Sequence, residues 1–206
     1  MPIFNLQTLM SQATAMVGQR LDLTPSQVSF WANTAQLEVA TRAPHMFMLA
    51  NSYFSTSASQ SSASLPTDFL SPVALVNLGS GDSWGNHTLR EVAQREVYNA
   101  SEGTANARPN RYAVAPPSLM LYPPADGAYS MQFTYYKTPS DLVSLSDTLS
   151  VGSALRPAVI FKLAEYLFAV TLDQEREAFA RNRYLSFVGS TPSDEAFKYR
   201  SERSSI

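Results

Sequence analysis

The chain has 206 residues, of which 45% are hydrophobic, and it contains no cysteine. This composition predicts a folded chain with a hydrophobic core, and it excludes disulfide bonds and thiolate chemistry. The formal net charge of −2 argues against tight binding of DNA or RNA as the main task, because proteins that neutralise phosphates are usually basic.

Two helices are predicted near the N-terminus, over 5–20 and 25–43, from apolar residues that recur at helical spacing. The second begins with a TPSQ segment at Thr24, in which threonine caps the helix and glutamine completes a capping box. Glu38 and Arg42 lie four residues apart and form a favourable pair on this helix. The N-terminus has no basic segment followed by an apolar run, so no signal peptide is predicted.

The middle of the chain is predicted to consist mainly of short strands, because it is rich in Ser, Thr, Pro, Gly and Tyr. The strand over 128–137 alternates, with residues 129, 131, 133 and 135 on one face, which is typical of a half-buried antiparallel strand. A proline-rich turn joins it to the strand before it, so the two are expected to form a hairpin. The expected elements are strands over 47–56, 73–78, 112–115, 119–122 and 128–137, a helix over 88–99 and a Ser-rich loop over 55–64.

Two more helices are predicted near the C-terminus. The run 154–172 is apolar nearly all round, as in a buried helix. Charged residues interrupt it at Arg156, Lys162 and Glu165. Three charges would cost several kcal/mol in a bilayer, so this run is not expected to be a membrane anchor. Asp173 can cap a polar helix that carries Glu177 and Arg181 as a favourable pair.

The predicted fold class is α+β. Helices at both ends of the chain, 1–46 and 150–190, are expected to form a helical bundle, with an antiparallel β-rich subdomain, 47–149, inserted between them. The last residues, 191–206, have no core-forming pattern and are expected to form an extended tail.

No catalytic, cofactor or metal site is predicted. His45 and His87 do not share a metal-binding frame. The glycine-rich segment 78–82 lacks the lysine of a phosphate-binding loop, and no G-x-S-x-G elbow occurs. A small hydrolase with a site around the two histidines and the Ser-rich loop remains an alternative.

Aromatic residues crowd the predicted hairpin. They are Tyr122, Tyr129, Phe133, Tyr135 and Tyr136. Three interpretations stay open: a sheet face packed on helices, a protein interface, where tyrosine is enriched, and a glycan-binding platform on a β module.

Three stretches carry a resemblance to a known family. They are SFWANTAQLEVATRAPHMFMLANSYFSTSASQSSASLPTDFLSPVAL, RYAVAPPSLMLYPPADGAYSMQFTYYKTPSDL and LRPAVIFKLAEYLFAVTLDQEREAFARNRYLSFV. In their order and texture they resemble the head-to-tail adaptor (connector) proteins of tailed bacteriophages, especially the tail-tube adaptors of short-tailed phages. The likeness covers most of the chain from residue 29 to residue 188.

The resemblance implies a non-enzymatic structural protein of the virion, assembled in the host cytoplasm and located at the head–tail junction. Such adaptors form a ring of about a dozen copies that joins the portal protein to the tail nozzle or other tail proteins. Genomic DNA would pass through the lumen without sequence-specific binding, and no membrane is involved. A near-neutral chain suits such a conduit, because a strongly basic lumen would retard DNA.

Two sets of residues are expected to contact partners. The resemblance implies that the tail docks on the portal, and the residues predicted for this contact are Phe197, Lys198, Tyr199 and Arg200. Ring closure needs a heterologous interface, in which one patch meets a different patch on the next copy. The residues predicted for this oligomer interface are Phe161, Tyr166, Arg176 and Arg183.

Overall fold

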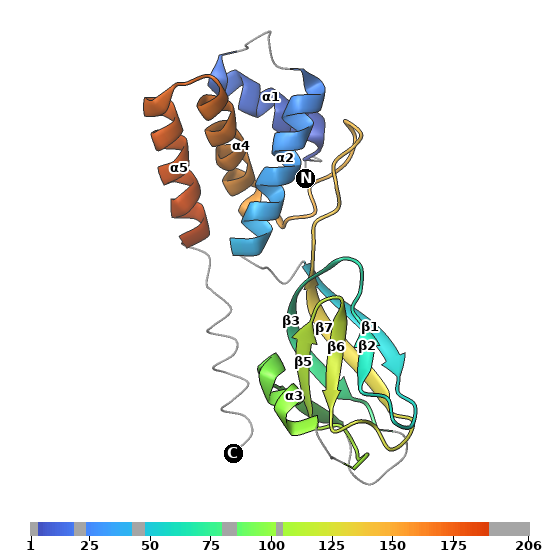
Figure 1. Cartoon of the computed structure of the whole chain (residues 1–206). Helices are drawn as coiled ribbons and strands as arrows, with labels where there is room; N and C mark the ends of the chain where they lie inside the picture. Colours follow the sequence, from blue (N-terminus) through green and yellow to red (C-terminus); the bar gives the residue numbers. More distant parts are fainter. Residues whose placement is uncertain (1–3, 19–23, 43–47, 80–85, 102–104, 190–206) are drawn as a thin grey trace. The chain divides into compact units, whose positions relative to one another are not determined.

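Figure 1 shows the computed structural model, which describes residues 4–18, 24–42, 48–79, 86–101 and 105–189. The chain divides into two compact units, one made of Met1–Met48 with Thr138–Ile206 and the other of Leu49–Lys137. Below, they are called the helical unit and the sheet unit. Within the described residues, no helix combines the length and the apolar character needed to cross a bilayer.

The helical unit is built around one long apolar helix. Its described helices are α1 (Leu6–Val17), α2 (Pro25–Arg42), the short 3-10 helix η2 (Ser153–Leu155), α4 (Arg156–Val170) and α5 (Gln174–Gly189). Helix α4 packs against α1, α2 and α5, and in Figure 1 it lies between α2 and α5. Their apolar side chains form one core, to which Leu142, Leu149 and Val151 also belong.

Local sequence determines where the first two helices begin. The predicted capping box of α2 is confirmed: the backbone N–H of Thr24 donates to Gln27 Oε1 at 2.9 Å, and the backbone N–H of Gln27 donates to Thr24 Oγ1 at 3.3 Å. Helix α1 begins after Asn5, whose side chain accepts from the backbone N–H of Thr8. It ends earlier than predicted, at Gly18, which adopts a φ of 88°.

The sheet unit contains a single curled sheet of seven strands (Figure 1). Its elements are β1 (Leu49–Ser55), β2 (Ser62–Ser64), β3 (Phe69–Asn77), β4 (His87–Glu91), helix α3 (Gln94–Ser101), β5 (Arg111–Ala115), β6 (Ser118–Tyr122) and β7 (Ser130–Lys137). The strand order is β1-β7-β3-β4-β5-β6-β2. All neighbouring strands are antiparallel except β4 and β5, which are parallel.

The predicted fold class is wrong in the form given above. The described residues form a mixed α/β architecture with a seven-stranded curled sheet and five α-helices, not a helical bundle with an inserted antiparallel subdomain. The parallel pair of β4 and β5 overturns the antiparallel expectation. Helix α3 lies between these two strands in the chain, and a parallel pair requires such a crossover connection.

Two predictions within the sheet are also wrong. Strands β6 and β7 do not form a hairpin: β6 pairs with β5 and β2, whereas β7 lies between β1 and β3. The helix expected over 88–99 is present only in its second half, as α3 from Gln94. Its first half forms strand β4, because Leu89 pairs with Leu75 of β3 and is buried there. The alternation of β7 is confirmed, since its buried residues include Met131, Phe133 and Tyr135.

Candidate protein interaction site

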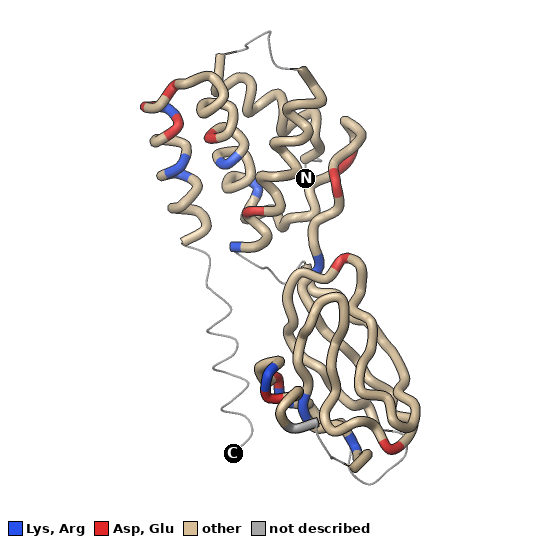
Figure 2. Tube along the Cα trace, in the orientation of Figure 1, with Lys and Arg blue, Asp and Glu red and all other residues tan. Residues whose placement is uncertain are grey.

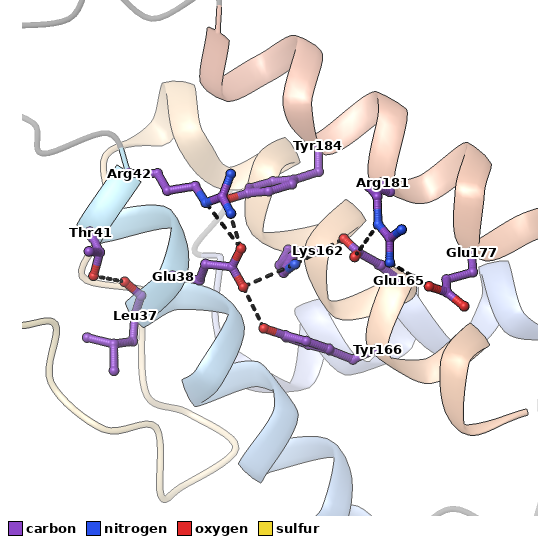
Figure 3. Close-up of polar contacts among 10 residues, drawn as sticks. All are labelled: Leu37, Glu38, Thr41, Arg42, Lys162, Glu165, Tyr166, Glu177, Arg181 and Tyr184. Atoms are coloured by element: carbon purple, nitrogen blue, oxygen red, sulfur yellow. Dashed lines mark hydrogen bonds and ion pairs between the residues drawn. The ribbon is translucent and has the colours of Figure 1, made fainter.

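A buried charge cluster lies where α2, α4 and α5 meet (Figure 3). At its centre is Lys162 of α4, whose Nζ lies 3.0 Å from Glu38 Oε2 of α2 and 3.1 Å from Glu165 Oε2 of α4. Lys162 is only 7% exposed. The rings of Tyr166 and Tyr184 flank its ammonium group, with centroids at 4.8 and 5.0 Å. A cation this deeply buried requires such partners, because an unpaired buried charge is costly.

Two arginines extend this charge cluster toward solvent. Arg181 of α5 places Nε 3.0 Å from Glu165 Oε1 and Nη2 2.7 Å from Glu177 Oε1. Arg42 places Nε 3.3 Å from Glu38 Oε1. The hydroxyl of Tyr184 on α5 donates to Glu38 Oε1 of α2 at 3.4 Å. Polar contacts therefore join α5 to both α4 and α2 in addition to the apolar core, and they hold the outer face of α5 in a defined position.

The protonation states of the charge cluster follow from burial and hydrogen bonding. Burial alone would raise the pKa of Glu38. The hydrogen bonds from Tyr166 and Lys162, with the charges of Lys162 and Arg42, outweigh burial and hold this pKa below its ordinary value. Burial, together with the bond that it donates to Glu38 at 2.6 Å, raises the pKa of Tyr166. Burial and the charge of Glu38 raise the pKa of Tyr184 to about 12. At neutral pH the tyrosines are thus neutral and Glu38 is charged, an arrangement that holds helices together.

The exposed face of α5 carries two arginines and a phenylalanine, here called the α5 stripe: Arg176, Phe179 and Arg183. They are three and four residues apart, so they share one helix face. The ring of Phe179 is 52% exposed, and the guanidinium of Arg183 lies 5.4 Å from its centroid. Phe161 of α4 meets the same ring edge-on at 6.4 Å. An exposed aromatic ring beside arginines is typical of the residues that contribute most to protein interfaces.

A second surface feature lies on α2 and is here called the α2 groove. It is a hollow of about 510 Å³ lined by Phe30, Asn33, Thr34, Gln36, Leu37, Thr138, Pro139 and Asp141. The segment after β7 forms one wall because α2 holds it by side-chain hydrogen bonds. Gln36 Nε2 donates to the carbonyl of Ser140 at 2.7 Å, and Asn33 Nδ2 donates to the carbonyl of Leu142 at 3.2 Å.

Comparison with known proteins decides the kind of protein to which these surfaces belong. A family model described as SU10 adaptor protein matches residues 5–202. The chain belongs to the SU10 adaptor protein family. No curated protein matches the chain.

Membership in this family confirms the predicted relationship to phage adaptors. The adaptor family is structural and is not a known enzyme family. The adaptor is therefore a structural component of the virion that contacts other virion proteins. The short-tailed subtype stays a prediction.

Three of the four residues predicted for the oligomer interface of the adaptor come together. Arg176 and Arg183 belong to the α5 stripe, and Phe161 packs beneath it. Tyr166 lies elsewhere, because its hydroxyl donates to Glu38 inside the charge cluster. Sequence reasoning missed Phe179, although its position between the two arginines on one helix face was a usable signal. It also missed the α2 groove, which exists only because residues 138–141 fold against α2.

Of the two histidines considered for catalysis, only His87 lies in the described part of the adaptor. His87 is exposed on β4 and lines a hollow of about 350 Å³ with Arg108, Pro109 and Asn110. His45 and most of the glycine-rich segment 78–82 lie outside the described residues. Where the structure describes the chain, no three His, Asp or Glu side chains gather as a metal-binding group.

The aromatic residues of the predicted hairpin mainly form core. Phe133, Tyr135 and Tyr136 are buried, and Phe133 stacks on Phe69 and Tyr135 at centroid distances of 5.8 and 5.5 Å. The hydroxyl of Tyr135 donates to Asp68 at 2.8 Å. Burial, followed by this contact, raises the pKa of Tyr135 to about 12. Among the described residues, Phe133 and Tyr135 therefore belong to the core of the sheet unit itself and do not pack on helices, and their burial argues against a glycan platform.

The residues predicted to dock on the portal lie outside the described part of the adaptor. They are Phe197, Lys198, Tyr199 and Arg200.

Proposed function

We propose that the adaptor forms a ring of about a dozen copies at the head–tail junction, where it joins the portal protein to the tail. The observation that carries this proposal is the family match over residues 5–202. Genomic DNA would cross the lumen of the ring without sequence-specific contacts. The formal net charge of −2 supports this role, because a strongly basic lumen would bind phosphates and retard the DNA.

Ring closure requires a heterologous interface between neighbouring copies. The α5 stripe is suited to be one of its two patches, because Phe179 and its flanking arginines are exposed yet held in place. Phe161 supports the ring of Phe179 from below, and the charge cluster ties α5 to the rest of the helical unit. Such a preorganised patch loses little conformational entropy on association.

The tail, 191–206, would provide the contact to the portal, with Phe197, Lys198, Tyr199 and Arg200 as its anchors. The sheet unit would then be available to the tail nozzle or to other tail proteins. Assembly in the host cytoplasm onto DNA-filled heads would place the ring at the junction.

Native mass spectrometry of the purified chain, with and without portal rings of the same phage, tests this function. We expect a complex that contains a ring of adaptor copies on the portal. A chain that stays monomeric and unbound when portal rings are present would overturn the proposal. The variant Val143→Glu adds charge at an exposed residue outside the α5 stripe, so it should form the same complex with portal rings as the unsubstituted chain.

A further inference from the structure

The α2 groove presents an apolar surface on a helix face that is otherwise solvent-exposed. Phe30 and Leu37, seven residues apart on α2, are 61% and 45% exposed. The threonines beside them use their hydroxyl protons inside the helix: Thr34 donates to the carbonyl of Phe30 at 3.0 Å, and Thr41 donates to the carbonyl of Leu37 at 2.8 Å. The hydroxyl protons of these threonines are therefore not available to a partner. This face of α2 offers a partner the threonine methyl groups and the side chains of Phe30 and Leu37.

The α2 groove also has a negative electrostatic character. Gln36 is 1% exposed and lines the groove, and its Oε1 has no hydrogen-bond partner within the described residues. Buried acceptors are normally paired, so this oxygen marks a place where a donor is missing. Among the described lining residues, Asp141 carries the charge, and it is exposed. A cation next to apolar surface is the complement to such a groove.

The α5 stripe has that complementary chemistry. It offers two guanidinium groups and the exposed ring of Phe179 between them. Arg176 and Arg183 are seven residues apart, as are Phe30 and Leu37, so each pair spans about 10 Å along its helix. Figure 2 shows charged residues along α5, whereas α2 carries charge only near its C-terminal end, at Glu38 and Arg42.

We propose that the α5 stripe of one copy packs into the α2 groove of the next copy. Phe179 would fill the space between Phe30 and Leu37, and an arginine of the stripe would approach the exposed Asp141. This inference rests on the proposed ring, and it assigns both patches of its repeating interface.

The two surfaces favour a heterologous contact over a two-fold one. They lie on α2 and α5, and α4 lies between these helices and packs against both (Figure 1). A contact between two α5 stripes would bring arginines against arginines, which is unfavourable. A stripe-to-groove contact leaves one free stripe and one free groove at the ends of any open chain of copies. Such a contact repeats from copy to copy, and it forms a ring when the rotation between neighbouring copies closes.

Cysteine cross-linking tests this arrangement. The chain contains no cysteine, so only the introduced thiols can react with the cross-linker. Thr34→Cys places a thiol in the groove, and Asn182→Cys places one beside Phe179 on the exposed side of α5. The adaptor is assembled on portal rings and treated with a short bismaleimide. The chain that carries both substitutions should give a ladder of cross-linked oligomers. A mixture of the two single variants should stop at dimers, and each single variant alone should give none.

The outcomes separate this inference from the proposed function. If rings form on the portal but the doubly substituted chain gives no ladder, the assigned interface is wrong and the ring proposal stands. Dimers from either single variant would indicate a two-fold contact and would overturn the inference in the same way. If the unsubstituted chain forms no ring with portal, the proposed function itself fails. Val143→Cys combined with Asn182→Cys is the matched control, because residue 143 is exposed but lies outside the groove.

Discussion

At the scale of single residues, Lys162 is the buried centre of the charge cluster that joins α2, α4 and α5. Its ammonium is shared between Glu38 and Glu165, and two tyrosine rings cover it. Removing the cation leaves two carboxylates near each other in a poorly solvated site. Removing an exposed cation leaves its partner in water, where it loses little.

We predict that Lys162→Met lowers the free energy of unfolding by about 3–5 kcal/mol, because it breaks a buried ion pair from one side. Arg176→Met removes an ion pair with Asp173 in which both side chains are substantially exposed. It should cost about 1 kcal/mol or less. Urea denaturation at neutral pH compares the two variants. Equal losses would show that the charge cluster contributes no more than a surface pair.

The lowered pKa of Glu38 predicts an effect of pH. A carboxyl whose pKa is lower in the folded than in the unfolded chain stabilises the fold above its ordinary pKa of 4.5, and this stabilisation is lost as the pH falls below that value. Glu38→Gln should therefore be less stable than the unsubstituted chain at neutral pH, and the difference should shrink as the solution is acidified below 4.5. Denaturation curves of both chains over a series of pH values measure this difference in the free energy of unfolding. A difference that is constant with pH would contradict the assignment.

Sequence reasoning found the local half of the charge cluster and missed the distant half. Glu38 with Arg42 and Glu177 with Arg181 are pairs of one helix turn, and both predicted pairs are present. The contact of Lys162 with Glu38 joins helices far apart in the chain, so spacing carries no signal for it. In the sequence, Lys162 and Glu165 merely interrupt an apolar run.

Whole elements show the same division between local and distant causes. The start of α2 was predictable because its capping box involves residues three apart. The β4 strand was not, because Leu89 and Val97 also suit one face of a helix. The pairing of Leu89 with Leu75 on β3 decides the outcome, and that contact depends on the rest of the sheet. The wrongly predicted hairpin of β6 and β7 also follows from distant contacts. The alternation of β7 shows that one of its faces is buried, but it does not identify the strands that pair with β7.

Helix capping gives a prediction at this scale. Thr24→Ala removes the side-chain oxygen that accepts from the backbone N–H of Gln27 and should destabilise the helical unit by about 1 kcal/mol. Thr41→Ala makes the same chemical change within α2, where the hydroxyl bonds back to the carbonyl of Leu37. Alanine is the better helix former there, so this variant should be neutral or slightly stabilising. Thermal unfolding followed by circular dichroism distinguishes the two. Equal losses would mean that the capping box is not what stabilises α2.

At the scale of the whole molecule, the sheet unit has its own hydrophobic core. Core residues from five strands pack together: Leu75, Leu89, Tyr112, Leu119, Leu121, Met131, Phe133 and Tyr135. The chain enters this unit at β1 and leaves it after β7. These two strands pair with Leu49 opposite Tyr136, so the entry and exit points are adjacent.

We therefore predict that the fragment 49–137 folds when it is expressed alone. Its core is complete within those residues, and cutting the chain at two adjacent points breaks no strand pair. The fragment should unfold in a single cooperative transition and show dispersed amide resonances. Broad resonances without a cooperative transition would show that the sheet unit needs the helical unit in order to fold.

The tail gives the last prediction, since it separates stability from attachment. The described core of the helical unit ends with residues of α5, at Tyr184 and the partly buried Phe187 and Val188. All described members of this core lie before residue 190, so we expect the deletion of residues 192–206 to leave the melting temperature nearly unchanged. If the tail holds the anchors for the portal, the same deletion should abolish co-sedimentation of the adaptor with portal rings. A truncated chain that unfolds would assign the tail to the fold, whereas one that still binds would place the portal contact on another surface. The double variant Phe197→Ala with Tyr199→Ala keeps the length of the tail and removes only these two aromatic rings. If these rings are anchors, it should weaken co-sedimentation with portal rings.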